Sequence, residues 1–387
     1  MSKMKFQLNN IWGFALTAGL FCSGCSEELS IEQKDVGEKK KALTSQMVIN
    51  AIDGVANSKQ LTIQPVLQRE VTSILKRHAD TNYTGRGWAV VLSVSNGAVL
   101  AMADCGAGDA QSRPLAVKKF FDPGHTVSPF AVAAAFNDGV VTPDSKISTC
   151  EDRDKYPYII GDDKIFGVIE FAVKDALPRS VNSVIKKIGQ DLGDNVYSAL
   201  TSFGLSKNAI IDFDVFDVNG VGGVNLSKMQ GSKKMQSVVS VGQGFEVSAL
   251  QLARAYAIIA NRGCWVDPSF ECVEKPAGKQ IISADVAEKL VKILLVKEKS
   301  TGRKAAVSDV DVAGKTGTAQ IKDDIGQYET DCFTAIFAGF FPVEKPSHVV
   351  VVCYETRRNA SRNYFGGDRP AEAFAEIAEF CIKHKDK

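Results

Sequence analysis

The residues best suited to chemistry stand in one short run, Lys315-Thr316-Gly317-Thr318, within a segment whose pattern predicts a strand over residues 310–320. At the edge of a sheet, the lysine would offer an ammonium group and the two threonines would offer hydroxyl groups to a carboxylate. The glycine would leave room for the backbone of a ligand beside the strand. The run therefore predicts a strand that binds a carboxylate-bearing ligand.

The same run contains Gly314-Lys315-Thr316, three residues that also occur in nucleotide-binding phosphate loops. Such a loop requires a glycine five residues before Gly314, where this chain has Asp309. It also requires a helix after the lysine, where this chain predicts a strand. The phosphate-loop interpretation is therefore rejected.

A second candidate element, Ser180-Val181-Asn182, stands at the start of a helix expected over residues 181–192. A hydroxyl and a carboxamide near a helix start can share protons and hold an amide substrate. The alternative is that Ser180 is an ordinary N-cap and that Asn182 faces solvent. The element has functional meaning only in combination with others.

Hydrophobic periodicity and turn residues predict the elements that must position these groups. Two strand-like runs around Asn96-Gly97 predict a hairpin. A helix is expected after Pro123-Gly124 as far as residue 137, and Ser248 with Gln251 suits a capping box at the start of another. The other expected elements are the helix 181–192, a helix around 286–294, strands at 310–320, 334–341 and 348–354, and a closing helix over 370–382. This order predicts one mixed domain with a largely antiparallel sheet.

The amino terminus, residues 1–25, predicts an export signal of the lipoprotein type. Lys3 and Lys5 precede an apolar segment at 11–21, which is shorter than the roughly 20 residues that span a bilayer. Ser23 and Gly24 before Cys25 resemble a lipidation site, and an ordinary cleaved signal or a short membrane anchor is the alternative. Residues 26–58 are polar and predict a linker, which leaves residues 59–387 for the folded domain.

Composition argues against several classes of function. The chain carries 46 Lys and Arg against 45 Asp and Glu, so its net charge of +1 gives no indication of a nucleic-acid partner. Its nine cysteines form no Cys-x-x-Cys pair and no cluster with histidine, so we expect no metal site. No cofactor is expected either.

Taken together, the motifs resemble those of a known family. Ser-x-x-Lys, a Ser-x-Asn element and Lys-Thr-Gly form the active-site set of penicillin-binding proteins and serine β-lactamases. This chain carries the second and third of these in the family's order, at residues 180–182 and 315–317. The segments Ser240-Val241-Gly242-Gln243-Gly244 and Tyr364-Phe365-Gly366-Gly367 are similar to class B penicillin-binding proteins, which carry the transpeptidase domain of cell-wall synthesis. The resemblance covers residues 61–382 and implies an α+β fold, a five-stranded antiparallel sheet flanked by helices with an added helical lobe.

The first element of the set is altered. In the family a Pro-Gly turn leads to Ser-x-x-Lys at a helix start, whereas here Pro123-Gly124 leads to His125-Thr126-Val127-Ser128. His125 therefore takes the position of the nucleophilic serine, and Ser128 takes that of the lysine. A serine hydroxyl becomes a good nucleophile only when a nearby base takes its proton. Both halves of that pair are replaced, so we expect a domain without acyl-transfer activity.

Three replacements for the missing nucleophile remain open. Ser183 and Lys186 fit the Ser-x-x-Lys spacing inside the helix 181–192. His125 could itself attack a carbonyl, or it could act as the base for Ser128, which lies three residues later on the same helical face. Each of these would give an active D,D-transpeptidase or carboxypeptidase with a non-standard nucleophile, and a β-lactam sensor would also need acylation.

The resemblance also implies roles for individual residues. Lys315, Thr316 and Thr318 would hold a carboxylate of a peptidoglycan stem peptide, and Ser180 and Asn182 would flank its amide. Backbone N–H groups near His125 and Thr318 would form an oxyanion hole. The expected protein is an exported, membrane-anchored lipoprotein of the bacterial cell envelope that faces the periplasm. Its expected partners are the stem peptide or proteins of cell-wall synthesis and division.

Overall fold

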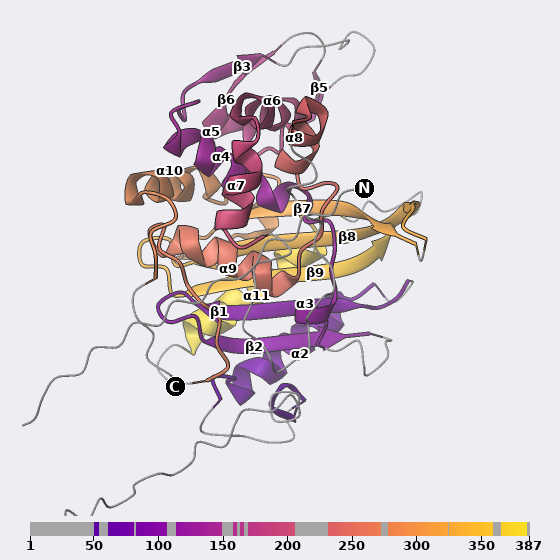
Figure 1. Ribbon diagram of the computed structural model, residues 1–387. Helices are drawn as coiled ribbons and strands as arrows, with labels where there is room; N and C mark the ends of the chain where they lie inside the picture. Colours follow the sequence, from indigo (N-terminus) through magenta and orange to yellow (C-terminus); the bar gives the residue numbers. More distant parts are fainter. Residues whose placement is uncertain are drawn as a thin grey trace, which may run out of the picture. The chain divides into compact units, whose positions relative to one another are not determined.

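A computed structural model gives the fold of the chain (Figure 1). Among the residues it describes, no helix is both long enough and apolar enough to cross a membrane. The predicted signal segment, Cys25 and the predicted linker up to residue 49 lie outside the described residues. The structure describes residues 50–53, 61–80, 83–106, 114–148, 158–160, 163–165, 169–205, 231–271, 278–323, 325–358 and 365–384.

Five antiparallel strands form the main sheet, as the resemblance implied. The predicted hairpin at Asn96-Gly97 is confirmed and supplies two of them, and the other three come from the carboxy-terminal part of the chain. In spatial order the strands are β2 (Val99–Cys105), β1 (Gly87–Ser93), β9 (His348–Arg357), β8 (Tyr328–Phe341) and β7 (Ala313–Lys322). The strand with the Lys-Thr-Gly run, β7, is therefore an edge strand.

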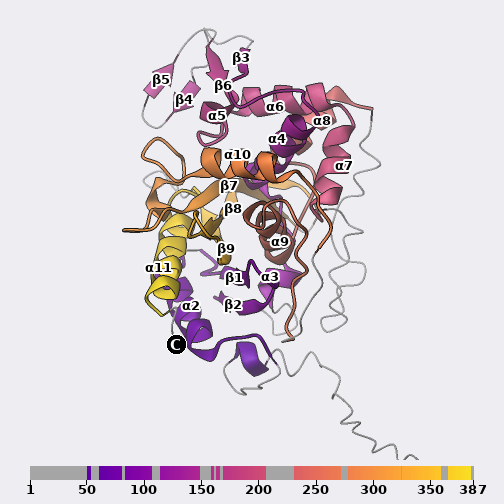
Figure 2. The same ribbon diagram turned by 90° about the vertical axis from the view of Figure 1, so that its left-hand side faces the viewer.

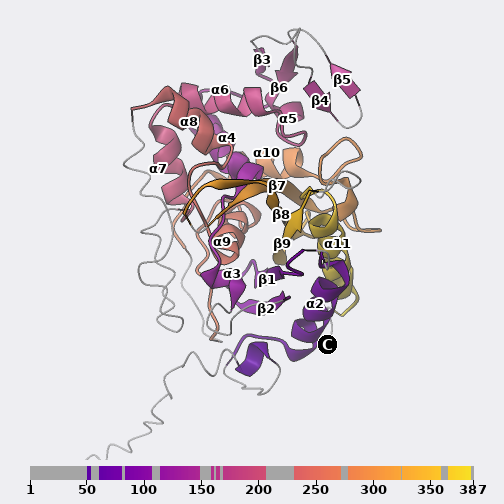
Figure 3. The ribbon, with the colours of Figure 1, turned by 90° about the vertical axis from the view of Figure 1, so that its right-hand side faces the viewer.

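Both faces of this sheet are buried, which explains the continuous apolar run in β9. Val349 and Val351 pack in one hydrophobic cluster, and Val350 and Val352 pack in the other, because successive strand residues point to opposite faces. One face is covered by α2 (Pro65–His78) and α11 (Arg369–Lys383), and the other by α9 (Ala249–Ala260). Figures 2 and 3 show these helices on opposite sides of the sheet.

Helix α9 is the central support of the second face, and all of its residues are buried. A helix that is apolar on every side requires protein around it, here the sheet, α10 (Ala284–Leu294) and α3 (Leu115–Lys118). Its predicted capping box is confirmed: Ser248 accepts from the backbone N–H of Gln251, whose side chain accepts from the backbone of Ser248.

The predicted helical lobe lies beyond β7 in Figure 1. Its helices pack on one another through α4 and α6, and two small two-stranded sheets accompany them. The lobe contains α4 (Ser128–Asn137), α5 (Val173–Ala176), α6 (Asn182–Leu192), α7 (Asn195–Ser202) and α8 (Lys233–Ser240), with strand pairs β3 (Lys146–Ser148) and β6 (Glu170–Ala172), and β4 (Tyr158–Ile160) and β5 (Asp163–Ile165).

Three local predictions need correction. The strand expected from residue 310 begins at Ala313, because Asp309 has a left-handed φ of 63° and turns the chain between Val307 and Val310. The helix expected after Pro123-Gly124 starts as the 3-10 turn η2 (Gly124–Val127) and becomes α-helical only at Ser128. Helix α2 was missed, although apolar residues recur along it with helical spacing after its initial proline.

Candidate active site

The buried carboxylate of Asp122, just before the turn η2 that carries His125, holds this turn in place. Asp122 Oδ1 lies 3.0 Å from Lys322 Nζ, and its Oδ2 accepts from the Tyr328 hydroxyl at 2.7 Å. The same Oδ2 accepts from the backbone N–H of Gly244 at 3.2 Å. One side chain therefore joins η2 to both strands of the β7–β8 hairpin and to the segment after α8.

Glycines allow the elements around η2 to approach it closely. The Gly124 N–H donates to the Gly242 carbonyl at 2.9 Å, and a Cβ on Gly242, whose φ is +75°, would lie 2.0 Å from the Gly124 oxygen. On the other side, a Cβ on Gly317 would lie 2.5 Å from the Pro123 oxygen. The absence of a side chain at Gly317 therefore makes room for the turn that carries His125.

The imidazole of His125 is held at both ring nitrogens. Nδ1 lies 2.9 Å from Ser128 Oγ, and Nε2 lies 2.8 Å from Asn182 Oδ1. With the carboxamide oxygen facing it, Nε2 carries the proton and donates, so Nδ1 accepts from the Ser128 hydroxyl. The structure thus joins the turn that carries His125 directly to the Ser180-Val181-Asn182 element.

Ser128 contacts other protein groups through its hydroxyl and has no access to solvent. Its exposed fraction is 0%, and its hydroxyl also lies 3.2 Å from the Ser240 carbonyl. A buried hydroxyl cannot reach a carbonyl carbon of an external substrate without movement of the turn. The hydrogen-bonded order Ser128, His125, Asn182 resembles a nucleophile, base and orienting amide, but the serine stands on the inner side of the ring.

The site carries little positive charge near neutral pH. Burial, followed by the positive charge of Lys315, lowers the pKa of His125 from 6.5 to about 3, against an opposing hydrogen bond to Asn182. Burial also lowers the pKa of Lys315 from 10.5 to about 7. The imidazole is therefore neutral, and the amine of Lys315 changes its charge within the physiological range.

Lys315 contacts the Ser180-Val181-Asn182 element. Its side chain is 1% exposed, and its Nζ donates to Ser180 Oγ and lies 3.1 Å from the Thr316 carbonyl. Ser180 is not the N-cap of α6, which is Val181 without a side-chain cap. With a left-handed φ of 54°, Ser180 lies outside the helix and accepts from the lysine instead.

The two threonines of the run also have partners, and the Thr316 hydroxyl accepts from Lys315 Nζ at 3.3 Å. Thr316 Oγ1 lies 2.6 Å from Thr301 Oγ1, and Thr318 Oγ1 accepts from the Gly366 N–H at 3.1 Å. Thr301, whose N–H donates to the Pro178 carbonyl, was not identified from the sequence. No local motif marks it, because its importance depends on a contact fifteen residues away along the chain.

The backbone of Thr318 faces the free edge of β7. Val296 N–H donates to the Val312 carbonyl, so Val312 faces away from β8, and alternate residues after it do the same. Thr318 belongs to this set. A Cβ on Gly124 would lie 3.1 Å from both the nitrogen and the oxygen of Thr318, so η2 lies against this part of the edge.

The alternative pair Ser183 and Lys186 lies further along α6, where both residues are half-buried. Asn182 directs its carboxamide to His125, and successive residues of a helix point about 100° apart. The contacts that join α6 to η2 and β7 therefore run through Asn182 and Ser180. Ser183 directly follows Asn182 in the chain, and the positive charge of Lys186 helps to lower the pKa of His125.

The low pKa of His125 predicts a pH-dependent stability. Between about pH 3 and 6.5 the unfolded chain binds a proton at His125 that the folded chain does not, so the free energy of unfolding falls as the pH falls. We expect His125→Gln to remove up to about 1.4 kcal/mol per pH unit of that slope. Urea unfolding of both proteins from pH 4 to 7 measures the difference. Parallel curves would contradict an imidazole that stays neutral in the folded chain.

Comparisons with known proteins agree with this geometry. Residues 87–379 match the family model described as the penicillin binding protein transpeptidase domain. The chain is 27% identical to the penicillin-binding protein PbpB of Mycolicibacterium smegmatis, over 86% of the chain and 55% of PbpB. It is 29% identical to the probable peptidoglycan D,D-transpeptidase PenA of Neisseria flavescens, over 75% of the chain and 74% of PenA. The match thus spans just over half of PbpB.

Solved structures show the same fold. The transpeptidase domain of Burkholderia pseudomallei penicillin-binding protein 3 superposes with a TM-score of 0.72 at 24% identity, covering 86% of this chain and 98% of that domain. Penicillin-binding protein 3 of Mycobacterium tuberculosis, solved with aztreonam, gives 0.69 at 23% identity, covering 84% of this chain and 79% of that one. The chain belongs to the penicillin-binding-protein transpeptidase domain family.

Proposed function

We propose that this protein is a cell-envelope member of the family that binds a peptidoglycan stem peptide without acyl transfer. One observation carries the proposal: the ring at the nucleophile position is engaged at both nitrogens, and the only hydroxyl bonded to it, that of Ser128, is buried. Attack on a carbonyl needs a free lone pair on His125 or an exposed hydroxyl. Neither is present in this arrangement.

The binding half of the proposal rests on what the site retains. Lys315 remains joined to Ser180, and Asn182 stands beside it at the start of α6. The outer edge of β7 offers backbone groups to which a peptide could add as a further strand. The relatives named as peptidoglycan D,D-transpeptidases act on peptidoglycan, so a stem peptide with a terminal carboxylate is the ligand that fits an amine at this position.

The contending function is an active D,D-transpeptidase or carboxypeptidase with a non-standard nucleophile. The hydrogen-bonded series from Ser128 through His125 to Asn182 favours it, because the order matches nucleophile, base and orienting amide. Ser183 or His125 as nucleophile, and a β-lactam sensor, require the same first step. All of these therefore share one test, the formation of an acyl-enzyme.

Incubation of the purified chain with a fluorescent penicillin, followed by intact-mass measurement, distinguishes the two functions. We expect no covalent adduct, since no activated nucleophile faces the ligand. The double variant His125→Ser, Ser128→Lys restores the Ser-x-x-Lys pair and should gain an adduct if the rest of the site is competent. An adduct on the unaltered chain, mapped by peptide mass to Ser128, Ser183 or His125, would refute the inactive interpretation and name the nucleophile.

Removal of the Lys315 amine tests the binding half. Lys315→Ala should weaken binding of a synthetic peptide ending in D-Ala-D-Ala by about tenfold or more, since a charged hydrogen bond contributes about 1.5–3 kcal/mol. Because the pKa of Lys315 lies at about 7, binding to the unaltered chain should also weaken from pH 6 to pH 8. Calorimetric titration measures both effects, with the exposed Lys383→Ala as control. Equal affinities of the unaltered chain, Lys315→Ala and Lys383→Ala for the peptide would indicate a scaffold in which Lys315 does not bind the peptide.

The amino-terminal segments suggest how the domain reaches its ligand. We propose that residues 1–25 direct export, that Cys25 is lipidated, and that residues 26–58 tether the domain, residues 59–387, to the membrane. Proteins of cell-wall synthesis or division would then be its partners. Radiolabelled palmitate should be incorporated by the unaltered chain and not by Cys25→Ser in bacteria expressing each. Label retained in the variant would show that Cys25 is not the anchor.

A further inference from the structure

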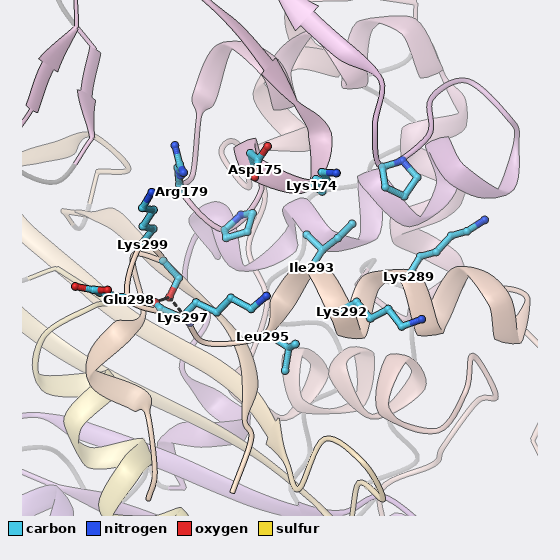
Figure 4. A pocket seen from close by; sticks show the side chains of 13 residues that line it. Lys174, Asp175, Arg179, Lys289, Lys292, Ile293, Leu295, Lys297, Glu298 and Lys299 are labelled. Carbon is cyan, nitrogen blue, oxygen red and sulfur yellow. Dashed lines mark hydrogen bonds between the residues drawn. The ribbon is translucent and has the colours of Figure 1, made fainter. Parts of the chain in front are cut away.

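A cavity of about 590 Å³ lies between the lobe and α10, and His125 is not among its lining residues (Figure 4). Its walls come from α5, the turn before α6, the carboxyl end of α10 and the loop at residues 297–300. This volume lies within the range of pockets that bind small ligands or short peptide segments. The cavity has no part in the function proposed above.

The cavity is strongly cationic. Six of its thirteen lining residues are lysine or arginine and two are acidic, whereas the whole chain has a net charge of only +1. Arg179, Lys297 and Lys299 form no ion pair within the described part of the chain. Lys297 extends toward Ile293 in Figure 4.

The other three cations form only exposed pairs. Lys289 and Lys292 each contact a carboxylate four residues earlier on α10, and Lys174 contacts Asp144. Exposed pairs of this kind contribute little, about 0–1 kcal/mol, and exchange readily for a ligand carboxylate. An anion that enters the cavity therefore meets cations that are either unpaired or weakly paired.

Apolar residues complete the lining and restrict the kind of anion. Pro143, Pro178, Ile293 and Leu295 line the same cavity. A phosphate polymer would leave these side chains without a partner, and an acyl chain would leave most of the cations without one. A peptide segment that carries both carboxylates and aliphatic side chains matches both parts. Lysines suit such a segment, because their flexible stems place point charges without a fixed geometry.

We infer that this cavity is a docking site for an acidic, aliphatic segment of a partner protein. The site adjoins the Lys315 strand: the Pro178 carbonyl accepts from Thr301, whose hydroxyl contacts Thr316 at 2.6 Å. Arg179 directly precedes Ser180 in the chain. A docked segment would therefore lie beside the stem-peptide site without occupying it.

The test uses the full chain and a short fluorescent peptide of Glu-Glu-Leu repeats, with fluorescence anisotropy at low and moderate salt. We expect the triple variant Arg179→Ala, Lys297→Ala, Lys299→Ala to weaken binding about tenfold or more, and added salt to weaken binding to the unaltered chain. A matched control, Lys76→Ala, Lys233→Ala, Lys234→Ala, removes the same charge from exposed helix positions and should change the affinity less than about twofold.

Further probes separate this proposal from its alternatives and from the proposed function. Gln-Gln-Leu and Glu-Glu-Ser repeats should both bind more weakly, because each lacks one of the two complementary features. Lys315→Ala should leave binding of the Glu-Glu-Leu peptide unchanged, so either proposal can fail alone. Equal loss in the cavity and control variants, or cavity-dependent binding of inorganic polyphosphate or anionic vesicles in place of the peptide, would overturn the inference. Thermal unfolding of each variant shows that it is folded.

Discussion

The close approach of η2 to β7 is the constraint on which the site depends. A turn of the backbone lies directly against an edge strand only where no side chain intervenes, and Gly317 and Gly242 supply those places on its two sides. The buried carboxylate of Asp122 then fixes the turn to the hairpin and to Gly244. These contacts involve the backbone and neighbouring residues, and none of them uses the side chain of His125.

The altered pair preserves hydrogen bonding while it removes charge. An imidazole at position 125 and a hydroxyl at position 128 fill the space between Asn182 and the Ser240 carbonyl, and the single proton of the Ser128 hydroxyl goes to His125 Nδ1. A neutral hydrogen-bonded pair costs little in the interior, whereas an isolated buried charge is costly. The pKa of His125 is low for this reason, because burial and the positive charge of Lys315 both oppose protonation of the ring. The neutral imidazole at position 125 is therefore compatible with the family's fold.

The sequence by itself determined the family and the type of fold. The Asn96-Gly97 hairpin, the capping box at Ser248 and the glycine after α6 are local features, and each depends on residues a few positions apart. The replacement of the Ser-x-x-Lys pair by His125 and Ser128 was equally visible in the sequence, since it needs only the flanking residues for its recognition.

Only the tertiary structure decided how these residues meet. Thr301, the burial of Ser128 and the role of Gly317 involve contacts between segments that are distant in sequence, so local spacing carries no signal for them. The cationic cavity is a second example. The net charge of the chain is only +1, so the composition gives no sign that α10 and the following loop place lysines close to Arg179. Periodicity predicts which face of an element is buried, but the identity of the facing group is fixed by how the elements pack.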